Sequence, residues 1–257
     1  MIEITDIDDK RVSEFKNLKK NHNNTNTFIA DGEKVVLKLL NSDLKILKIF
    51  SKKEFILENI ELINTKISNN NIFYADKQLL ADIIGFRLHT GVMALAAPKE
   101  MTSLENLVGN IVILNNIIDA ENVGSIIRNC VGFGFLNIIL DKQSAYLYLR
   151  RTVRVSMGAV FKINYLYTDN LINTIKHLKQ RNFTIISIEN TTNSENLFDY
   201  KVISNLAIIF GNESKGINSD ILEISDKILQ IPITKSIDSL NVSNASAIAL
   251  NYFYNLK

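Results

Sequence analysis

Short apolar runs alternate with longer amphipathic segments along the second half of the chain. Five runs have the length of a buried strand: 110–114 (NIVIL), 137–140 (NIIL), 183–188 (FTIISI), 206–210 (LAIIF) and 228–233 (ILQIPI). In the segments between them, such as 169–181, apolar residues recur every three to four positions, which is typical of amphipathic helices. Continuous apolar strands that alternate with helices indicate a mostly parallel sheet covered on both faces. We therefore predict an α/β domain over residues 106–257.

The helix expected after the first of these strands carries an unusual line of residues. An apolar stripe in the segment 122–135 (NVGSIIRNCVGFGF) predicts a helix that buries one face. A second line on the same helix holds Gly124, Arg128 and Gly132, each four residues apart. Each glycine costs a helix about 1 kcal/mol relative to alanine, so glycines on both sides of an arginine suggest that its surroundings must stay open. Gly134 suits the position that follows a helix C-cap.

The first hundred residues show shorter and less regular patterns. From about residue 28 to 97, short strand-like runs accompany a helical segment within FIADGEKVVLKLL, which indicates a small α/β domain. Residues 1–27 are polar and end in a predicted loop, NHNNTNT, and nothing in them points to a function. The stretch 98–103 begins with one of only two prolines and is the predicted linker. The sequence thus predicts domains at 1–100 and 106–257.

The composition favours a protein with a sizeable core and argues against disulfide-rich, metal-binding and membrane-spanning classes. The 257 residues are 46% hydrophobic and carry a net charge of +2, so a sizeable core is expected and any basic surface must be local. One cysteine and three scattered histidines predict neither a disulfide framework nor a metal site. The N-terminus lacks the pattern of a signal peptide, and no apolar run approaches the ~18 residues of a membrane span. We expect a cytoplasmic protein without a membrane partner.

Three polar loops follow predicted strands: 119–124 (DAENVG), 211–218 (GNESKGIN) and 234–246 (TKSIDSLNVSNAS). In an open parallel sheet, ligands bind beyond the carboxyl ends of the strands, so these loops predict a binding site on one edge. The GNESKG segment lacks the spacing of a P-loop and of a dinucleotide fingerprint. Alone, it is equally well explained as a turn followed by an N-cap.

Together the three loops and their flanks resemble the SpoU family of RNA ribose 2′-O-methyltransferases, within the SPOUT superfamily. The matching segments are NVGSIIRNCVGFG, IIFGNESKGI and IPITKSIDSLNVSNASAIAL, in the family's order and spacing. The resemblance covers about 106–257, with Ala120 standing where proline is frequent, and 28–97 more weakly resembles a ribosomal-protein-like RNA-binding domain. It implies a deep trefoil knot in the second domain and a homodimer. We expect Tyr252, Phe253 and Leu256 of the last helix to help bury the dimer interface.

The resemblance also implies that S-adenosylmethionine is the methyl donor. Its binding residues carry over to five positions in the second and third segments: Gly211, Asn212, Glu213, Ile231 and Leu240. The strand end at Ile188 and Glu189 is expected to line the same pocket. Glycine at the first of these positions would let backbone approach the ligand closely.

The catalytic residue that the resemblance implies is Arg128, with Asn122, Ser239 and Asn241 orienting it and the ribose. A guanidinium with a pKa above ~12 would need a shift of about 5 units, or roughly 7 kcal/mol, to be neutral at pH 7. We therefore favour Arg128 as a clamp for phosphate or for the developing 2′-oxyanion, with action as a general base as the alternative. Loop hydrogen bonds or helix capping would explain the other three residues equally simply.

A basic stretch near the middle of the second domain suits RNA, since it combines positive charge with Tyr146 and Tyr148. The cations are Lys142, Arg150, Arg151 and Arg154. A solvated loop is the alternative explanation. The predicted reaction is ribose 2′-O-methylation of structured RNA, with ribosomal RNA favoured over transfer RNA. A base methyltransferase of the same superfamily and a non-catalytic RNA-binding or assembly protein are the competing readings.

Overall fold

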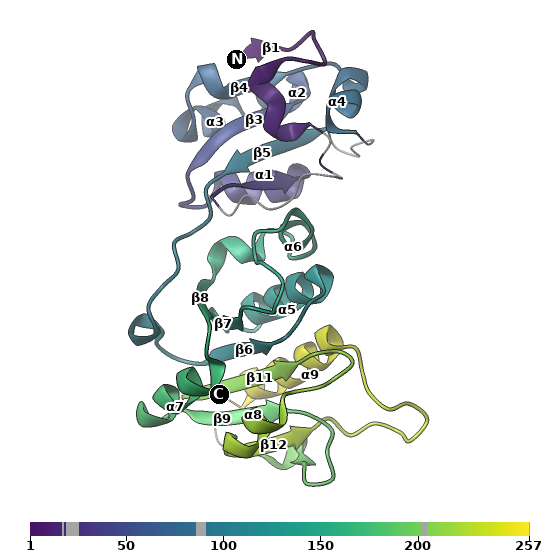
Figure 1. Cartoon of the computed structure of the whole chain (residues 1–257). Coiled ribbons are helices and arrows are strands. Elements are labelled where there is room, and N and C mark those ends of the chain that lie inside the picture. Colours follow the sequence, from purple (N-terminus) through teal and green to yellow (C-terminus); the bar gives the residue numbers. More distant parts are fainter. Residues whose placement is uncertain (17, 19–25, 86–90, 202–204, 257) are drawn as a thin grey trace. The chain divides into compact units, whose positions relative to one another are not determined.

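The computed structural model describes residues 1–16, 18, 26–85, 91–201 and 205–256, so most of the predicted NHNNTNT loop lies outside the described residues (Figure 1). The chain forms two compact units. The first comprises Met1–Lys99 together with Leu147–Phe161, and the second comprises Glu100–Tyr146 together with Lys162–Lys257. Each unit contains its own sheet.

The sheet of the first unit has the strand order β1-β4-β3-β5-β2. Its strands are β1 (Ile2–Glu3), β2 (Phe28–Asp31), β3 (Ile46–Ser51), β4 (Ile72–Tyr74) and β5 (Val92–Ala96). β5 pairs antiparallel with β2 and β3, whereas the other pairs are parallel. The helical elements are η1 (Lys10–Phe15), α1 (Glu33–Leu40), α2 (Lys53–Glu58), α3 (Ile60–Lys66), η2 (Asn69–Asn71) and α4 (Lys77–Ile84).

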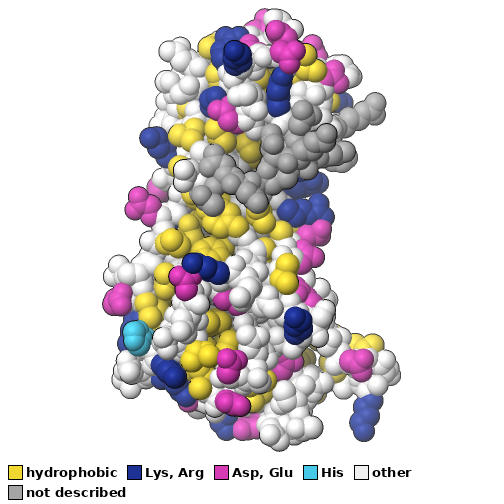
Figure 2. Space-filling model, viewed as in Figure 1, with side chains coloured by type: hydrophobic (Ala, Val, Ile, Leu, Met, Phe, Trp, Pro, Cys, Tyr) yellow, Lys and Arg dark blue, Asp and Glu magenta, His cyan; other side chains and the backbone are white. Residues whose placement is uncertain are grey.

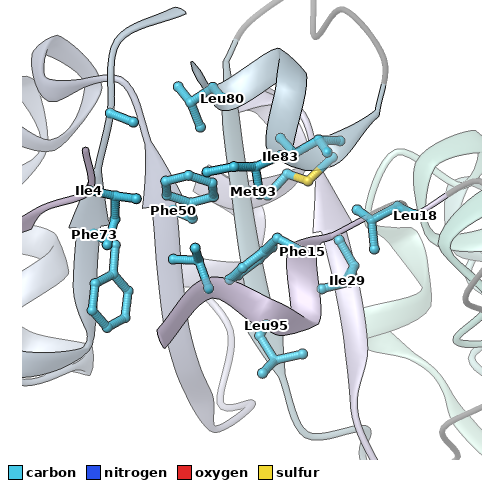
Figure 3. Close-up of a cluster of buried hydrophobic side chains, with 13 residues drawn as sticks. Ile4, Phe15, Leu18, Ile29, Phe50, Phe73, Leu80, Ile83, Met93 and Leu95 are labelled. Carbon is cyan, nitrogen blue, oxygen red and sulfur yellow. The ribbon is translucent and has the colours of Figure 1, made fainter. Parts of the chain in front are cut away.

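The N-terminal segment, expected from its sequence to be a polar lead-in, contributes to the core of the first unit (Figure 3). Val12 and Phe15 are fully buried, and Ile4 is nearly so. The ring of Phe15 lies 5.6 Å from that of Phe50 on β3. The segment's few apolar residues follow neither a helical nor a strand period, so its role in the core could not be read from its pattern.

The segment Leu147–Phe161 joins the first unit although it lies within the second predicted domain. It contains α6 (Arg150–Val155) and continues into η4 (Ala159–Lys162). The ring of Phe28 lies 4.8 Å from that of Tyr148. An ion pair of 2.9 Å connects Arg150 to Asp31 on β2. Apolar and ionic contacts therefore tie this segment to the strand that opens the first predicted domain.

The sheet of the second unit is entirely parallel, as the sequence predicted, with the order β10-β12-β9-β11-β6-β7-β8. Its strands are β6 (Ile111–Asn115), β7 (Asn137–Asp141), β8 (Asn164–Thr168), β9 (Thr184–Ile188), β10 (Glu195–Asn196), β11 (Leu206–Gly211) and β12 (Lys227–Gln230). The predicted run 228–233 ends earlier, since β12 stops two residues before Pro232. Proline has no N–H for the ladder.

Helices cover both faces of this sheet, as expected. They are α5 (Ala120–Gly132), α7 (Leu171–Gln180), α8 (Ser219–Ile224) and α9 (Val242–Asn255), with short turns η3 (Leu104–Asn106) and η5 (Leu197–Asp199). Ile113 and Ile209 pack with Ile175 of α7 and Ile221 of α8. Because successive strand residues point to opposite sides of a sheet, the residues next to Ile113 and Ile209 along their strands face the other side. On that other face, α9 contacts β11 and lies beside α5 (Figure 1).

The last helix, α9, corrects the expectation that Phe253 helps bury a dimer interface. Phe253 is fully buried within its own chain, so it cannot contribute to a dimer interface as expected. The hydroxyl of Tyr252 donates to the backbone oxygen of Tyr200 at 2.7 Å. The trefoil knot stays a prediction. Within the described residues, no helix is both long and apolar enough to cross a membrane.

Candidate functional site

The strand order of the second unit reverses between β6 and β11. After β6 the chain continues to its neighbour β7, whereas after β11 it continues to β12 on the opposite side. Such a reversal opens a crevice at the carboxyl ends of the two strands. A pocket of about 190 Å³ lies on the β11 side of this reversal, at the carboxyl ends of β9 and β11. The ends of β9 and β11, the loop 211–216, the residues after β12 and the start of α9 form its wall.

The loop after β11 folds back on itself through backbone and side-chain hydrogen bonds. Asn212 and Gly216 exchange both backbone N–H···O bonds, at 3.1 and 2.9 Å. The side-chain oxygen of Asn212 accepts from the N–H groups of Ser214 and Lys215, at 2.9 and 3.0 Å. Its amide nitrogen donates to the backbone oxygen of Asn116 at 2.8 Å, which ties the loop to the end of β6.

Two glycines make this fold of the loop possible. Gly216 has φ of +69°, in the left-handed region that glycine adopts without strain. A Cβ on Gly211 would lie 2.5 Å from both the carbonyl carbon of Gly216 and the nitrogen of Ile217. No side chain fits at that distance from backbone. The glycine spacing of GNESKG therefore reflects close backbone packing at the pocket wall.

A buried carboxylate supports the adjacent end of β6. Asp141, at the end of β7, is 6% exposed and accepts hydrogen bonds from the side chain of Asn115 at 2.9 Å and from the N–H of Asn116 at 2.7 Å. The side-chain oxygen of Asn115 in turn accepts from the N–H of Asn218 at 3.0 Å. This network was not predicted from the sequence, where its only sign is an acidic residue at the end of an apolar strand.

Side chains from the three predicted loops meet in a hydrogen-bonded chain. Asn122 donates to Glu213 at 2.6 Å, and Asn241 donates to the side-chain oxygen of Asn122 at 3.0 Å. The other end of the Asn241 amide caps α9, accepting from the N–H of Ser243 at 2.9 Å. Capping was one of the predicted explanations for Asn241. Because its amide nitrogen is used as well, the same side chain also links the first and third loops.

Arg128 has a different environment from these residues. It is exposed on α5 and forms no hydrogen bond or ion pair with any part of the chain that the structure describes, so Asn122, Ser239 and Asn241 do not hold it here. Its neighbour Asn129 donates to the backbone oxygen of Ser243 at 2.9 Å and so joins α5 to α9. The exposed guanidinium therefore lies on a helix that is anchored to α9 by the hydrogen bond of Asn129.

The end of α5 is also well defined. Gly134 has φ of +77°, as predicted for a residue after the C-cap. Its N–H donates to the oxygen of Val131, and the N–H of Phe135 donates to the oxygen of Cys130. These two bonds form a Schellman motif. A Cβ on Gly132 would have no neighbour within 4 Å, so the space beyond this turn is open.

The predicted RNA-binding cations are divided between the two units. Lys142, in the second unit, pairs with Asp169, while Arg150 pairs with Asp31 in the first. Arg151 and Arg154 are exposed on α6. On the face shown in Figure 2, Lys and Arg side chains are interspersed with Asp and Glu. The positive charge on this face is therefore local, as expected for a chain with a net charge of +2.

Of the two tyrosines that the sequence places beside the predicted RNA-binding cations, Tyr148 needs a correction. Tyr148 is 3% exposed, because it packs against Phe28, so its ring face is not available to a base. Tyr146 lies 6.0 Å from the ring of Tyr167, and partial burial raises the pKa of its hydroxyl. Tyr148 therefore cannot offer its ring to a nucleic-acid groove, whereas the part of Tyr146 in RNA binding stays a prediction.

The pocket collects the residues that the resemblance assigned to the donor. Its wall includes all five predicted donor-binding positions together with Ser239, Ile188 and Glu189. Two acidic residues, Glu189 and Glu213, belong to its lining, which in the described structure contains no lysine or arginine. This electrostatic character suits a positively charged ligand. Among the described residues, no group of His, Cys, Asp and Glu could hold a metal ion.

Comparison with known proteins gives one consistent result. The model of the SpoU rRNA Methylase family matches residues 109–251. An uncharacterized tRNA/rRNA methyltransferase of Mycobacterium tuberculosis is 28% identical over 260 residues, which cover 96% of this chain and 89% of the relative.

Two solved structures share the fold. An AdoMet-bound rRNA methyltransferase from Sinorhizobium meliloti superposes with a TM-score of 0.83 at 21% identity, covering 99% of this chain and 97% of that chain. A structure described as an RNA 2′-O ribose methyltransferase gives 0.77 at 19% identity, with 99% of each chain covered. Both matches extend over the first unit as well as the second.

Proposed function

The chain belongs to the SpoU rRNA methylase family and is an RNA methyltransferase, and on this premise we propose that it transfers a methyl group from S-adenosylmethionine to a ribose 2′-hydroxyl in structured RNA. The observation that carries the proposal is the convergence of Gly211, Asn212, Glu213, Ile231 and Leu240 on one pocket. The relative described as an RNA 2′-O ribose methyltransferase supports the choice of ribose as acceptor.

The pocket fits the donor in shape and charge. Backbone can approach a ligand closely at Gly211, which has no side chain to intervene. The carboxylate of Glu213, at the pocket wall, matches a ligand that carries a sulfonium and an ammonium group. When bound, the donor supplies an electrophilic methyl group on a positively charged sulfur. The protein's own task is then to align the acceptor oxygen and to assist loss of its proton.

Arg128 is the residue we assign to the acceptor side. It is the exposed cation of α5, and the adjacent residue Asn129 joins this helix to the pocket helix α9. A guanidinium keeps its proton at neutral pH, so we assign it to charge-assisted hydrogen bonds with the RNA phosphate or with the developing 2′-oxyanion. The chain of Asn122, Glu213 and Asn241 fixes the neighbouring loops in position.

Methyl transfer from an isotopically labelled donor tests the chemistry. RNA methylated by the protein is digested completely to nucleosides, and the nucleosides are then cleaved to sugar and free base. Label on the ribose supports the proposal, whereas label on the free base supports a base methyltransferase. Absence of donor binding in titration calorimetry would instead support a non-catalytic RNA-binding or assembly protein.

We propose ribosomal RNA as the substrate, because the matching family model and a structural neighbour are both described as rRNA methyltransferases. Mapping of ribose methylation in total RNA, with and without the protein, identifies the molecule and the nucleotide. A modified position in transfer RNA alone would reject this choice.

A homodimer is part of the proposal as well. Exposed apolar side chains on α9, Ile248 at 37% and Tyr254 at 50%, are available for an interface. Sedimentation of the active protein as a monomer would rule the dimer out.

A further inference from the structure

We propose that Glu189 is a positioning residue that holds the pocket loop 211–217 in its donor-binding conformation. The inference rests on the proposed donor site and adds to it a side chain from outside the three family-like loops. Glu189 follows directly after β9, and its own N–H donates to the oxygen of Leu229 at 3.0 Å. Its backbone is therefore held by the strand next to β9 in the sheet.

The carboxylate of Glu189 reaches across the pocket wall to the far end of the loop. Its Oε2 accepts the N–H of Ile217 at 2.8 Å, and its Oε1 accepts the N–H of Asn190 at 3.1 Å. The bond to Ile217 spans 28 residues of sequence, so it fixes two separate segments relative to each other.

The loop is shaped to receive this carboxylate. A Cβ on Gly216 would lie 2.6 Å from Oε2 of Glu189. On its other side, the peptide that joins Gly216 to Ile217 lies against Gly211, where a Cβ would approach within 2.5 Å. The peptide is thus enclosed between the Glu189 carboxylate and Gly211. Because Gly211, Asn212 and Gly216 all line the pocket, releasing the peptide would change the surface that meets the donor.

Two conservative variants of Glu189 separate its hydrogen bond to Ile217 from its negative charge. Glu189→Gln keeps the side-chain length and an oxygen that can accept from Ile217, but removes the charge. Glu189→Asp keeps the charge, but its shorter side chain cannot reach Ile217. Glu189→Ala removes both properties. Glu223→Ala is the matched control, because Glu223 is an exposed glutamate on α8 just after the same loop.

Titration calorimetry of the full chain with S-adenosylmethionine and with S-adenosylhomocysteine is the test, accompanied by steady-state kinetics. We expect Glu189→Asp and Glu189→Ala to weaken both ligands about tenfold, which corresponds to about 1.4 kcal/mol. The KM for the donor should rise by a similar factor while kcat changes less than about twofold. Glu189→Gln and Glu223→Ala should bind both ligands within about twofold of wild type.

The inference is overturned if Glu189→Asp binds like wild type, or if Glu189→Gln loses the donor but keeps the product, which would indicate a charge contact. Thermal unfolding is measured for every variant, and if the alanine variant unfolds, the comparison of Asp with Gln decides alone. Absence of donor binding by the wild-type protein would reject the proposed function, and with it this role of Glu189.

Discussion

The donor pocket and the arginine of the same unit differ in how much of their geometry the chain itself supplies. The loop 211–217 is held by hydrogen bonds to β6 and to the end of β9, as well as by its own backbone bonds. Arg128 is exposed and has no partner within the described ranges. One part of the site is formed before any ligand arrives, whereas the other presents a cation whose partner must come from outside.

This difference indicates a division of work between the two parts. A preorganised pocket binds without first ordering its own loops, which favours affinity for a small ligand. An exposed guanidinium gains little until a phosphate or oxyanion approaches and water is excluded. We therefore expect donor binding to be independent of RNA, and RNA to complete the site around Arg128.

The largest effect on donor binding is expected from Gly211→Ala, which disrupts the preformed pocket loop. The new Cβ would lie 2.5 Å from backbone atoms of Gly216 and Ile217, so the loop must move. We expect donor affinity to fall more than about thirtyfold, or about 2 kcal/mol, by titration calorimetry. Gly132→Ala is the control, because nothing lies within 4 Å of its Cβ, and it should bind the donor like wild type. Equal donor binding by both variants would contradict a loop fixed by close packing.

Arg128→Ala removes the exposed cation and should lower turnover without affecting the donor pocket. Loss of a charge-stabilising donor typically lowers kcat about 10²-fold or more, and we expect that loss here. Arg128→Lys then separates the two roles of the arginine. Collapse of RNA affinity together with turnover supports the clamp, whereas substantial activity with an altered pH–rate profile supports a general base. Lys176→Ala, at an exposed lysine of α7, is the control and should leave both quantities unchanged.

Variants of Asn122 test how far the donor pocket and the helix of Arg128 depend on each other. Asn122→Asp would place a carboxylate where Asn122 now donates to Glu213 at 2.6 Å, and like charges at that distance repel. We expect kcat/KM to fall about tenfold in this variant and less in Asn122→Ala, which only removes the bonds. Steady-state kinetics at saturating RNA measure the difference. An aspartate variant more active than the alanine variant would argue against this arrangement.

The smallest effect is expected from the basic residues that are predicted to bind RNA. Arg154→Ala should weaken RNA binding a few-fold and lower the slope of log affinity against log salt by about 1. Lys142→Ala should change this slope less, because Lys142 already pairs with Asp169. Filter binding over a series of salt concentrations gives both slopes. A larger change for Lys142 than for Arg154 would reverse the assignment.

Much of the second unit could be predicted because its strands are continuous apolar runs and its helices carry clear stripes. α5 shows this best, since the pattern located both the helix and Gly134 after its C-cap. β8 was not predicted, because it is an edge strand whose residues are mostly half-buried. α6, which lies in the second predicted domain but belongs to the first unit, was not predicted, since its sequence RRTVRV is too short and too polar to show a helical period.

The site was predictable where residue types are unusual and not where long-range contacts decide. The glycines of GNESKG were noticed in the chain itself, and Asn122 and Asn241 were assigned through the resemblance to a known family. The long-range partners of Asp141 and Glu189 lie 25 to 28 residues away in sequence, so the residues around these two acids do not reveal them. The burial of Tyr148 against Phe28 was hidden for the same reason.

Titration of the wild-type protein and of Arg128→Ala with S-adenosylmethionine, in the absence of RNA, tests the central claim most directly. The account predicts that both proteins bind the donor with the same affinity within about twofold, because the chain alone forms the pocket and Arg128 takes no part in it. A wild-type protein that binds the donor only when RNA is present, or an Arg128→Ala variant that has lost the donor, would contradict it.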